Sequence, residues 1–344
     1  MPVHAFVFPG QGSQSVGMGR DLAAAFAPAR EVFQEVDEVL KQKLSKLMFE
    51  GPGEELTLTE NTQPALMAMS LAVLRVLEKE GGFGLRQKSV VVAGHSLGEY
   101  SALAAAGAFS VADAARLLKL RGQAMQKAVP AGQGAMAALI GADMALAQEI
   151  CAEAATVPNS PTQASETEAP DSEGPDSDAP RKKPGTKEVI QPANDNGGGQ
   201  VVISGARAAV ERAVEIAKTK GVRRAMLLPV SAPFHCALMA PAADAMAEAL
   251  ENTPPAAPMV PLIANVSAAK VTDPAQIREL LVRQVTATVR WRECVQAMTS
   301  LGVDSFLELG AGKVLSGLIR RIVPDAATAA AGTPAEIEAV LKTL

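Results

Sequence analysis

The chain has 344 residues, of which 48% are apolar, and this length and composition can fill a sizeable core in about two domains. Aromatic residues make up only 3% of the sequence, and the net charge is -5 at pH 7. Broad stacking surfaces and an overall basic surface are therefore excluded, and we expect no nucleic-acid partner.

Residues 1–12, MPVHAFVFPGQG, contain no basic region, and their apolar run is too short for a signal peptide or a membrane span. We therefore expect a cytoplasmic protein that does not contact a membrane. The same residues predict a short strand that runs into a Gly-rich turn, and a helical pattern follows from about Gly19 to Leu44.

Helical periodicity runs through residues 62–82 and ends at a Gly pair, and the next apolar run, SVVVAG at 89–94, predicts a buried strand. Further strands are expected in RRAMLLPV (223–230), PLIANV (261–266) and VDSFLELG (303–310). Because helical patterns separate these strands, we predict an α/β fold. Its large subdomain, residues 1–130 and 205–344, is expected to be α/β-hydrolase-like with a mostly parallel sheet.

The middle of the chain predicts a second, smaller unit. GAMAALIG at 134–141 and GGQVVISG at 198–205 each predict a strand that a helical stretch follows, which indicates a small inserted ferredoxin-like subdomain of βαβ type over residues 131–204. Residues 158–187 are rich in Pro, Ser, Asp, Glu and Gly and contain few apolar residues. Such a segment buries too little surface to become ordered, so we expect a mobile loop there.

The segment GHSLG at 94–98 places Ser96 between a predicted strand and a predicted helix. This arrangement is typical of a nucleophile elbow, in which small flanking residues let the backbone turn sharply and expose the serine hydroxyl. The amide of Leu97 would then point into the same space. A Gly-rich tight turn with an inert serine remains the alternative at this point.

A serine nucleophile needs a base, and the chain contains three histidines. His4 lies at the chain start and His95 is adjacent to Ser96, so His235, which follows a predicted strand, is the most economical candidate. No carboxylate between Ser96 and His235 lies at a convincing strand end, which weakens the reading as a hydrolase with an acid in its triad. The histidines have no metal-binding spacing and the three cysteines no CxxC spacing, so we expect neither a metal site nor a disulfide framework.

Several segments taken together resemble the malonyl-CoA:acyl carrier protein transacylase family. The resemblance runs from residue 3 to about residue 343 outside the 158–187 loop, and one GxSxG pattern alone would be weak support for it. The matching segments are FVFPGQGSQSVGMG, TENTQPAL, GHSLGEYSAL, RGQAMQKAVP, GAMAALIG, PANDN, QVVISG, PFHCALM, the NV at 265–266, LVRQV and LELGAGKVLSGLIRRI.

The resemblance implies a ping-pong transfer through a malonyl ester on Ser96, with His235 as general base and then general acid. It also implies that the main-chain carbonyl of Gln284, rather than a carboxylate, orients the imidazole. The backbone amides of Gln11 and Leu97 would form the oxyanion hole.

The resemblance implies four residues that contact the substrate. Arg121 would pair with the malonyl carboxylate, because a buried carboxylate requires a charged partner. Phe234 would crowd the carbon between the two carbonyl groups and disfavour methylmalonyl, and Gln63 and His95 would complete the substrate site.

The implied partners are malonyl-CoA and holo acyl carrier protein, and no cofactor or metal is expected beyond the phosphopantetheine that the carrier brings. We expect a monomer. Because acyl carrier proteins are acidic, a basic docking face is expected, for which the candidates are Arg116, Lys119, Arg320 and Arg321. Two alternatives remain open: a serine thioesterase or esterase that uses the same Ser-His pair, and a non-catalytic module that binds acyl thioesters.

Overall fold

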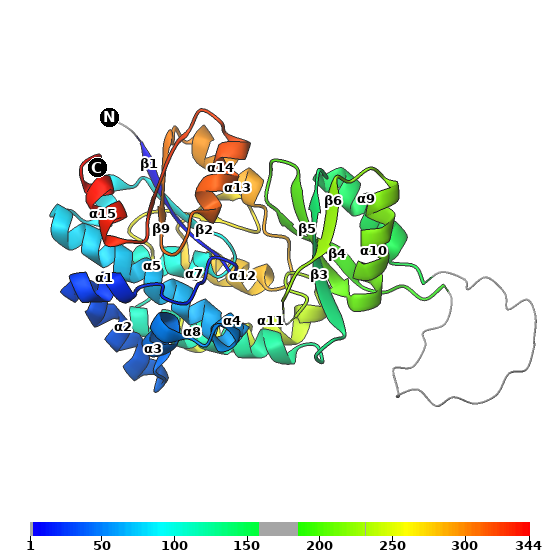
Figure 1. Ribbon diagram of the computed structural model, residues 1–344, viewed down its shortest axis with the longest axis horizontal. Helices are drawn as coiled ribbons and strands as arrows, with labels where there is room; N and C mark the ends of the chain where they lie inside the picture. Colours follow the sequence, from blue (N-terminus) through cyan, green and yellow to red (C-terminus); the bar gives the residue numbers. More distant parts are fainter. Residues whose placement is uncertain (1–2, 158–184, 231) are drawn as a thin grey trace, which may run out of the picture.

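Two separate β-sheets organise the chain in the computed structural model, which describes residues 3–157, 185–230 and 232–344 (Figure 1). The larger sheet has the strand order β10-β9-β1-β2-β7-β8, and every neighbouring pair is parallel except β7 and β8. Its strands are β1 (His4–Phe8), β2 (Val91–Gly94), β7 (Leu262–Ala264), β8 (Ala269–Val271), β9 (Ser305–Leu309) and β10 (Ala327–Ala331). The predicted mostly parallel sheet is confirmed.

Helices cover both faces of this sheet, as the alternation along β1 shows. Ala5 and Val7 join a buried cluster with Trp291, whereas Phe6 and Phe8 join the main core on the opposite face. The helices of the described residues are α1 (Arg20–Ala25), α2 (Ala27–Leu40), α3 (Leu44–Glu50), α4 (Gly53–Thr57), α5 (Thr59–Gly81), α6 (Leu85–Lys88), α7 (Gly98–Ala105), α8 (Val111–Lys127), α9 (Met144–Ala154), α10 (Arg207–Thr219), the 3-10 turn η1 (Ala237–Met239), α11 (Ala240–Asn252), α12 (Pro274–Gln284), α13 (Trp291–Ser300), α14 (Val314–Ile322) and α15 (Pro334–Leu341).

The smaller sheet is antiparallel, with the order β4-β5-β3-β6. Its strands are β3 (Gly134–Ile140), β4 (Ile190–Asp195), β5 (Gln200–Ala206) and β6 (Arg224–Leu227). With α9 and α10 between them, the elements follow in the order βαββαβ, which is the ferredoxin-like pattern. The two helices bury one face of the sheet, and Met136 and Val202 on the other face join the core of the large subdomain.

Two expectations from the sequence need correction. The strand expected in residues 223–230 forms as β6, but it pairs with β3 in the antiparallel sheet and not in the parallel one. The small sheet therefore extends beyond residue 204, the end that we predicted for the small subdomain. The helical pattern from Gly19 to Leu44 is broken at Phe26, whose backbone is extended and caps the next helix, which starts at Ala27 and has Pro28 in its first turn.

Most of the loop predicted at residues 158–187 lies outside the described residues. At its end, Lys187 forms an antiparallel β-bridge with Thr156.

Candidate active site

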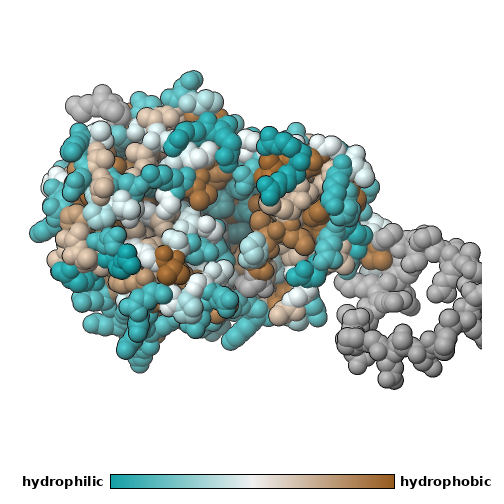
Figure 2. All heavy atoms as spheres, viewed as in Figure 1, coloured by the Kyte–Doolittle hydropathy of each residue, from teal (hydrophilic) through white to brown (hydrophobic). Residues whose placement is uncertain are grey.

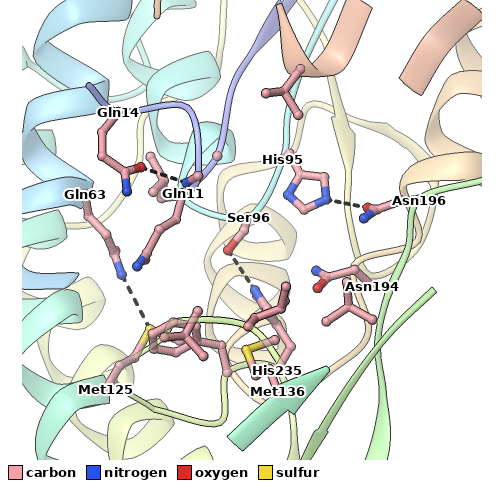
Figure 3. Close-up of a pocket in the computed structure, with 18 of the residues that line it drawn as sticks. Gln11, Gln14, Gln63, His95, Ser96, Met125, Met136, Asn194, Asn196 and His235 are labelled. Carbon is pink, nitrogen blue, oxygen red and sulfur yellow. Dashed lines mark hydrogen bonds between the residues drawn. The ribbon is translucent and has the colours of Figure 1, made fainter. Parts of the chain in front are cut away.

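A cavity of about 520 Å³ opens between the two subdomains, where β1 and β2 end (Figures 2 and 3). Ligands of open α/β sheets bind at this carboxyl edge of the strands. Met136 and Val202 of the small sheet line the opposite wall. The predicted residues that line the cavity are Gln11, Gln63, His95, Ser96, Leu97, Arg121, Phe234 and His235.

Ser96 lies on a sharp turn between β2 and α7, as the sequence predicts. Its φ of 55° is in the left-handed region, which a residue with a side chain adopts only under constraint. The glycines on either side allow the turn to approach its neighbours, because a Cβ added at Gly98 would lie 2.2 Å from the carbonyl oxygen of Phe8. The hydroxyl of Ser96 points into the cavity (Figure 3).

Two side chains from other elements hold the backbone of this turn. The Ser96 amide donates a hydrogen bond to Asn265 Oδ1 at 2.8 Å, and Gln284 Nε2 donates to the Ser96 carbonyl at 3.0 Å. Asn265 also donates to the carbonyl of Gly94 at 2.7 Å. Since Asn265 follows β7, which pairs with β2, the sheet itself brings this amide to the nucleophile. In the sequence alone, residue 265 is only part of the NV segment of the resemblance, and no local pattern predicts this role for it.

His235 Nε2 lies 2.7 Å from the Ser96 Oγ, and its Nδ1 lies 2.8 Å from the main-chain carbonyl oxygen of Gln284 (Figure 3 for the first contact). Because a carbonyl can only accept, Nδ1 carries the proton and Nε2 is left as the acceptor for the serine hydroxyl. Burial, and then the nearby Arg121 guanidinium, lower the pKa of His235 to about 3. The imidazole is therefore neutral at pH 7 and able to take a proton.

Arg121 is 1% exposed and extends from α8 to the floor of the cavity. Its guanidinium donates to the side-chain oxygens of Gln63 and Gln284, both at 2.8 Å, and to the Ser96 Oγ at 3.3 Å. Its Nε has no hydrogen-bond partner among the described residues, and no carboxylate there forms an ion pair with the group. Burial lowers the pKa of Arg121. A buried cation whose hydrogen-bond acceptors are all neutral oxygens is suited to receive an anionic ligand.

Glu99 is a buried carboxylate that the sequence analysis did not single out, although it lies three residues after Ser96. Its Oε2 accepts hydrogen bonds from Gln284 Nε2 at 2.7 Å and from the amide of Asn265 at 3.2 Å. Burial raises the pKa of Glu99 to about 7, against the opposing effect of these hydrogen bonds and of Arg121. The side chain of Gln284 thus links Glu99 to Arg121, a connection that no local pattern could have indicated.

The two residues whose amides are predicted to form an oxyanion hole border the same cavity. Gln11 follows β1 and Leu97 follows the nucleophile, and both residues line the cavity beside Ser96. Within the described part of the chain, neither backbone amide donates to another protein group. Two unpaired amides, one after β1 and one at the start of α7, can stabilise a negative oxygen.

The other predicted substrate residues also border the cavity. Phe234 is 8% exposed and directly precedes His235. His95 Nε2 donates to Asn196 Oδ1 at 2.9 Å and makes no contact with the Ser96 hydroxyl (Figure 3). Gln63 Nε2 lies 3.6 Å from the sulfur of Met125, which leaves its oxygen directed at Arg121.

The four basic residues expected at a docking face lie on two helices that are well separated in Figure 1. On α8, Arg116 pairs with Asp113 and Lys119 pairs with Glu60. Arg320 and Arg321 lie in the last turn of α14 and pair with no carboxylate among the described residues.

Within residues 3–157, 185–230 and 232–344, no group of three or more His, Cys, Asp or Glu side chains is placed to hold a metal ion. Within the same ranges, every helix is too short or too polar to cross a membrane.

Comparison with known proteins adds to this geometry. A family model described as an acyl transferase domain matches residues 5–172 and 173–337. The malonyl CoA-acyl carrier protein transacylase of Salmonella typhimurium is 44% identical over 341 residues, which cover 99% of each chain. A crystal structure of an acyl-carrier-protein S-malonyltransferase from Bartonella henselae has 52% identity and a TM-score of 0.88 over 99% of both chains. A malonyl-transacylase solved with its type II polyketide synthase acyl carrier protein has 42% identity and a TM-score of 0.87, covering 99% of this chain and 100% of that one.

Proposed function

Because this chain belongs to the malonyl CoA-acyl carrier protein transacylases of the acyl transferase family, we propose that it transfers malonyl from malonyl-CoA to the phosphopantetheine thiol of holo acyl carrier protein. The observation that carries the proposal is the contact between a Ser-His pair and a buried guanidinium that has no carboxylate partner among the described residues. The Ser-His pair provides acyl transfer. The guanidinium of Arg121 selects an acyl chain that carries a negative charge.

In the first half-reaction, Ser96 Oγ attacks the thioester carbonyl of malonyl-CoA while His235 Nε2 accepts the hydroxyl proton. The carbonyl oxygen becomes negative and receives hydrogen bonds from the amides of Gln11 and Leu97. As the tetrahedral intermediate collapses, the carbon–sulfur bond breaks and His235 returns the proton to the departing sulfur of coenzyme A. A malonyl ester remains on Ser96.

In the second half-reaction, the thiol of the carrier protein takes the place that coenzyme A has left. His235 accepts the thiol proton, the sulfur attacks the ester carbonyl, and the proton passes to the Ser96 oxygen as the ester bond breaks. The Gln284 carbonyl holds the imidazole throughout. A neutral acceptor stabilises the imidazolium less than a carboxylate would, which suits a transfer in which sulfur is the leaving group of the first half-reaction and the nucleophile of the second.

Arg121 would pair with the free carboxylate of the malonyl group. The carboxylate carbon lies two carbon–carbon bonds from the carbonyl that Ser96 attacks, and the guanidinium lies 3.3 Å from the Ser96 Oγ. One residue can therefore hold the carboxylate during both half-reactions. These steps use only groups of the chain and the two substrates, so we propose that no further cofactor is needed; the expected monomeric state stays a prediction.

The test is mass spectrometry of the intact protein after mixing with malonyl-CoA and then with holo acyl carrier protein. We expect a malonyl adduct that is absent in Ser96→Ala, strongly reduced in Arg121→Ala, and lost when the carrier thiol becomes acylated. Ser101→Ala is the matched control, because Ser101 lies on the same helix and its hydroxyl has no partner in the described residues.

Two other outcomes would support the alternative functions. Discharge of the adduct to water with no acylated carrier would indicate a thioesterase. Failure of the unmodified protein to form any adduct would indicate a non-catalytic module that binds acyl thioesters.

A further inference from the structure

One buried carboxylate behind the cavity takes no part in the steps proposed above. Glu99 lies in the first turn of α7 and is 1% exposed. A carboxylate is costly to bury, so its position requires specific partners. Those partners are the two residues that hold the backbone of the nucleophile, Asn265 and Gln284.

The Gln284 carboxamide is in contact with groups of opposite hydrogen-bonding character at its two ends. Its Oε1 accepts from Arg121 at 2.8 Å, while its Nε2 donates to Glu99 Oε2 at 2.7 Å and to the Ser96 carbonyl at 3.0 Å. Rotation of the amide by about 180° would place NH₂ against the guanidinium and oxygen against two other oxygens. The contacts therefore specify one orientation of this side chain.

Glu99 contributes the strongest acceptor on the Nε2 side. Without it, the Ser96 carbonyl would be the closest remaining acceptor for Nε2, since Asn265 Oδ1 is 3.4 Å away and already accepts from the Ser96 amide. The amide would then be free to turn, and Arg121 would lose one of the oxygens that hold it beside Ser96. Gln63 would be left as its main anchor.

We propose that Glu99 is a positioning residue, which fixes the Gln284 carboxamide and through it holds the Arg121 guanidinium in place for an acyl group that carries a carboxylate. The proposal rests on the proposed function, since it concerns how that site distinguishes malonyl from uncharged acyl groups. Glu99 itself would touch neither the substrate nor the reacting atoms.

The experiment compares kcat/KM for acylation of Ser96 by malonyl-CoA and by acetyl-CoA. In Glu99→Ala we expect the ratio of kcat/KM for malonyl-CoA to kcat/KM for acetyl-CoA to fall by about tenfold or more, because hydrogen bonds to charged groups are lost. Ser101→Ala should leave the ratio unchanged. A merely structural role for Glu99 would lower both values alike, and an unchanged ratio in a folded Glu99→Ala protein would overturn the proposal.

Two further variants test the route through Gln284. Gln284→Met removes the carboxamide but keeps the main-chain carbonyl that binds His235. It should lower the malonyl-to-acetyl ratio of kcat/KM about as much as Glu99→Ala does. The double variant that combines both changes should lower this ratio no further. If the double variant instead shows the sum of the two single losses, Glu99 does not act on Arg121 through Gln284. Glu99→Gln keeps an oxygen that can accept both hydrogen bonds, and it covers the case in which Glu99→Ala does not fold.

The Glu99→Gln variant should retain the ratio within about threefold, a loss smaller than one hydrogen bond to a charged group. If it loses as much as Gln284→Met, acceptance of these hydrogen bonds is not the role of Glu99. The proposed function is tested separately by the unmodified protein. If that protein is not malonylated on Ser96, the proposed function fails, whereas a malonylated protein with an unaltered ratio in the variants rejects only the role of Glu99.

Discussion

The guanidinium of Arg121 lies 3.3 Å from the Ser96 hydroxyl oxygen, so the group proposed to recognise the substrate and the group proposed to attack it are direct neighbours. Arg121 is also fully enclosed, which means that its charge is little screened by water. A carboxylate that reaches this position would form a charge-assisted bidentate contact.

Replacement of Arg121 by Ala should therefore change substrate preference more than it changes the chemistry. We expect the preference for malonyl-CoA over acetyl-CoA to fall about 30-fold to a few thousandfold, the range for loss of one partner of a desolvated charge pair. Acylation rates with both thioesters give the measurement. Arg116→Ala, at an exposed arginine on the same helix, should leave the preference intact, and an equal loss in both variants would contradict the assignment.

The pH dependence of acylation should reflect the buried state of His235. Its base form is present above its pKa and is lost as the pH falls through about 3, rather than through the ordinary value of 6.5. We expect kcat/KM with malonyl-CoA to stay nearly level from about pH 8 to about pH 5, where an unperturbed histidine would lose activity.

One other group can titrate in this range, since the pKa of Glu99 is raised to about 7. The profile should therefore also be measured in Glu99→Gln. An acid limb near pH 6.5 that persists in that variant would show that His235 titrates as an exposed histidine does.

The parts of this site that the sequence predicted are those with a local signal. Ser96 lies in the short turn between β2, which ends at Gly94, and α7, which starts at Gly98. His235 is the histidine that remains when the one near the chain start and the one beside the serine are set aside. The side-chain role of Gln284 has no such signal, because the contacts with Glu99 and Arg121 arise only when the end of α12 packs against α7 and α8.

Strand assignment failed for a related reason. The apolar run at 223–230 predicts a strand equally well in either sheet, and the partner of a strand is decided by tertiary packing. Here β6 pairs with β3, which completes the small sheet and leaves residues 228–230 to line the cavity. In the same way, the break at Phe26 gave two helices where periodicity alone predicted one.

The close approach of the two turns that form the oxyanion site can be tested at Gly10. A Cβ at this position would lie 2.6 Å from the carbonyl oxygen of His95, so the turn that carries Gln11 would have to move away from Ser96. We expect Gly10→Ala to lower kcat by up to about 1,000-fold, as loss of one oxyanion donor does, for malonyl and acetyl groups alike. Gly317→Ala is the control, since a Cβ there meets nothing within 4 Å. Retention of kcat in Gly10→Ala would argue against an oxyanion role for this turn.

Carrier docking should depend on the end of α14. Arg321 donates to Gln200, which lines the cavity, and neither Arg321 nor Arg320 pairs with a carboxylate among the described residues. Replacing both by Glu should raise KM for the carrier protein about tenfold at low salt and leave acylation by malonyl-CoA unchanged. The control replaces Arg116 and Lys119 by Glu, since their charges are already partly neutralised by Asp113 and Glu60. If only that second pair raises KM, docking lies on α8.

The size of the acyl group that the site accepts should depend on Phe234. This ring is nearly buried, lines the cavity and directly precedes His235, so it borders the space in which the carbon between the two malonyl carbonyls must lie. An extra methyl group there would meet the ring, and one methyl group in an apolar pocket accounts for about 10- to 200-fold in discrimination. Phe234→Ser should accordingly raise the ratio of methylmalonyl to malonyl transfer toward that range.

Val230→Ala, which widens the same cavity at another point of its wall, separates this effect from general enlargement. A gain of equal size in Val230→Ala, or no gain in Phe234→Ser, would show that Phe234 does not set the limit.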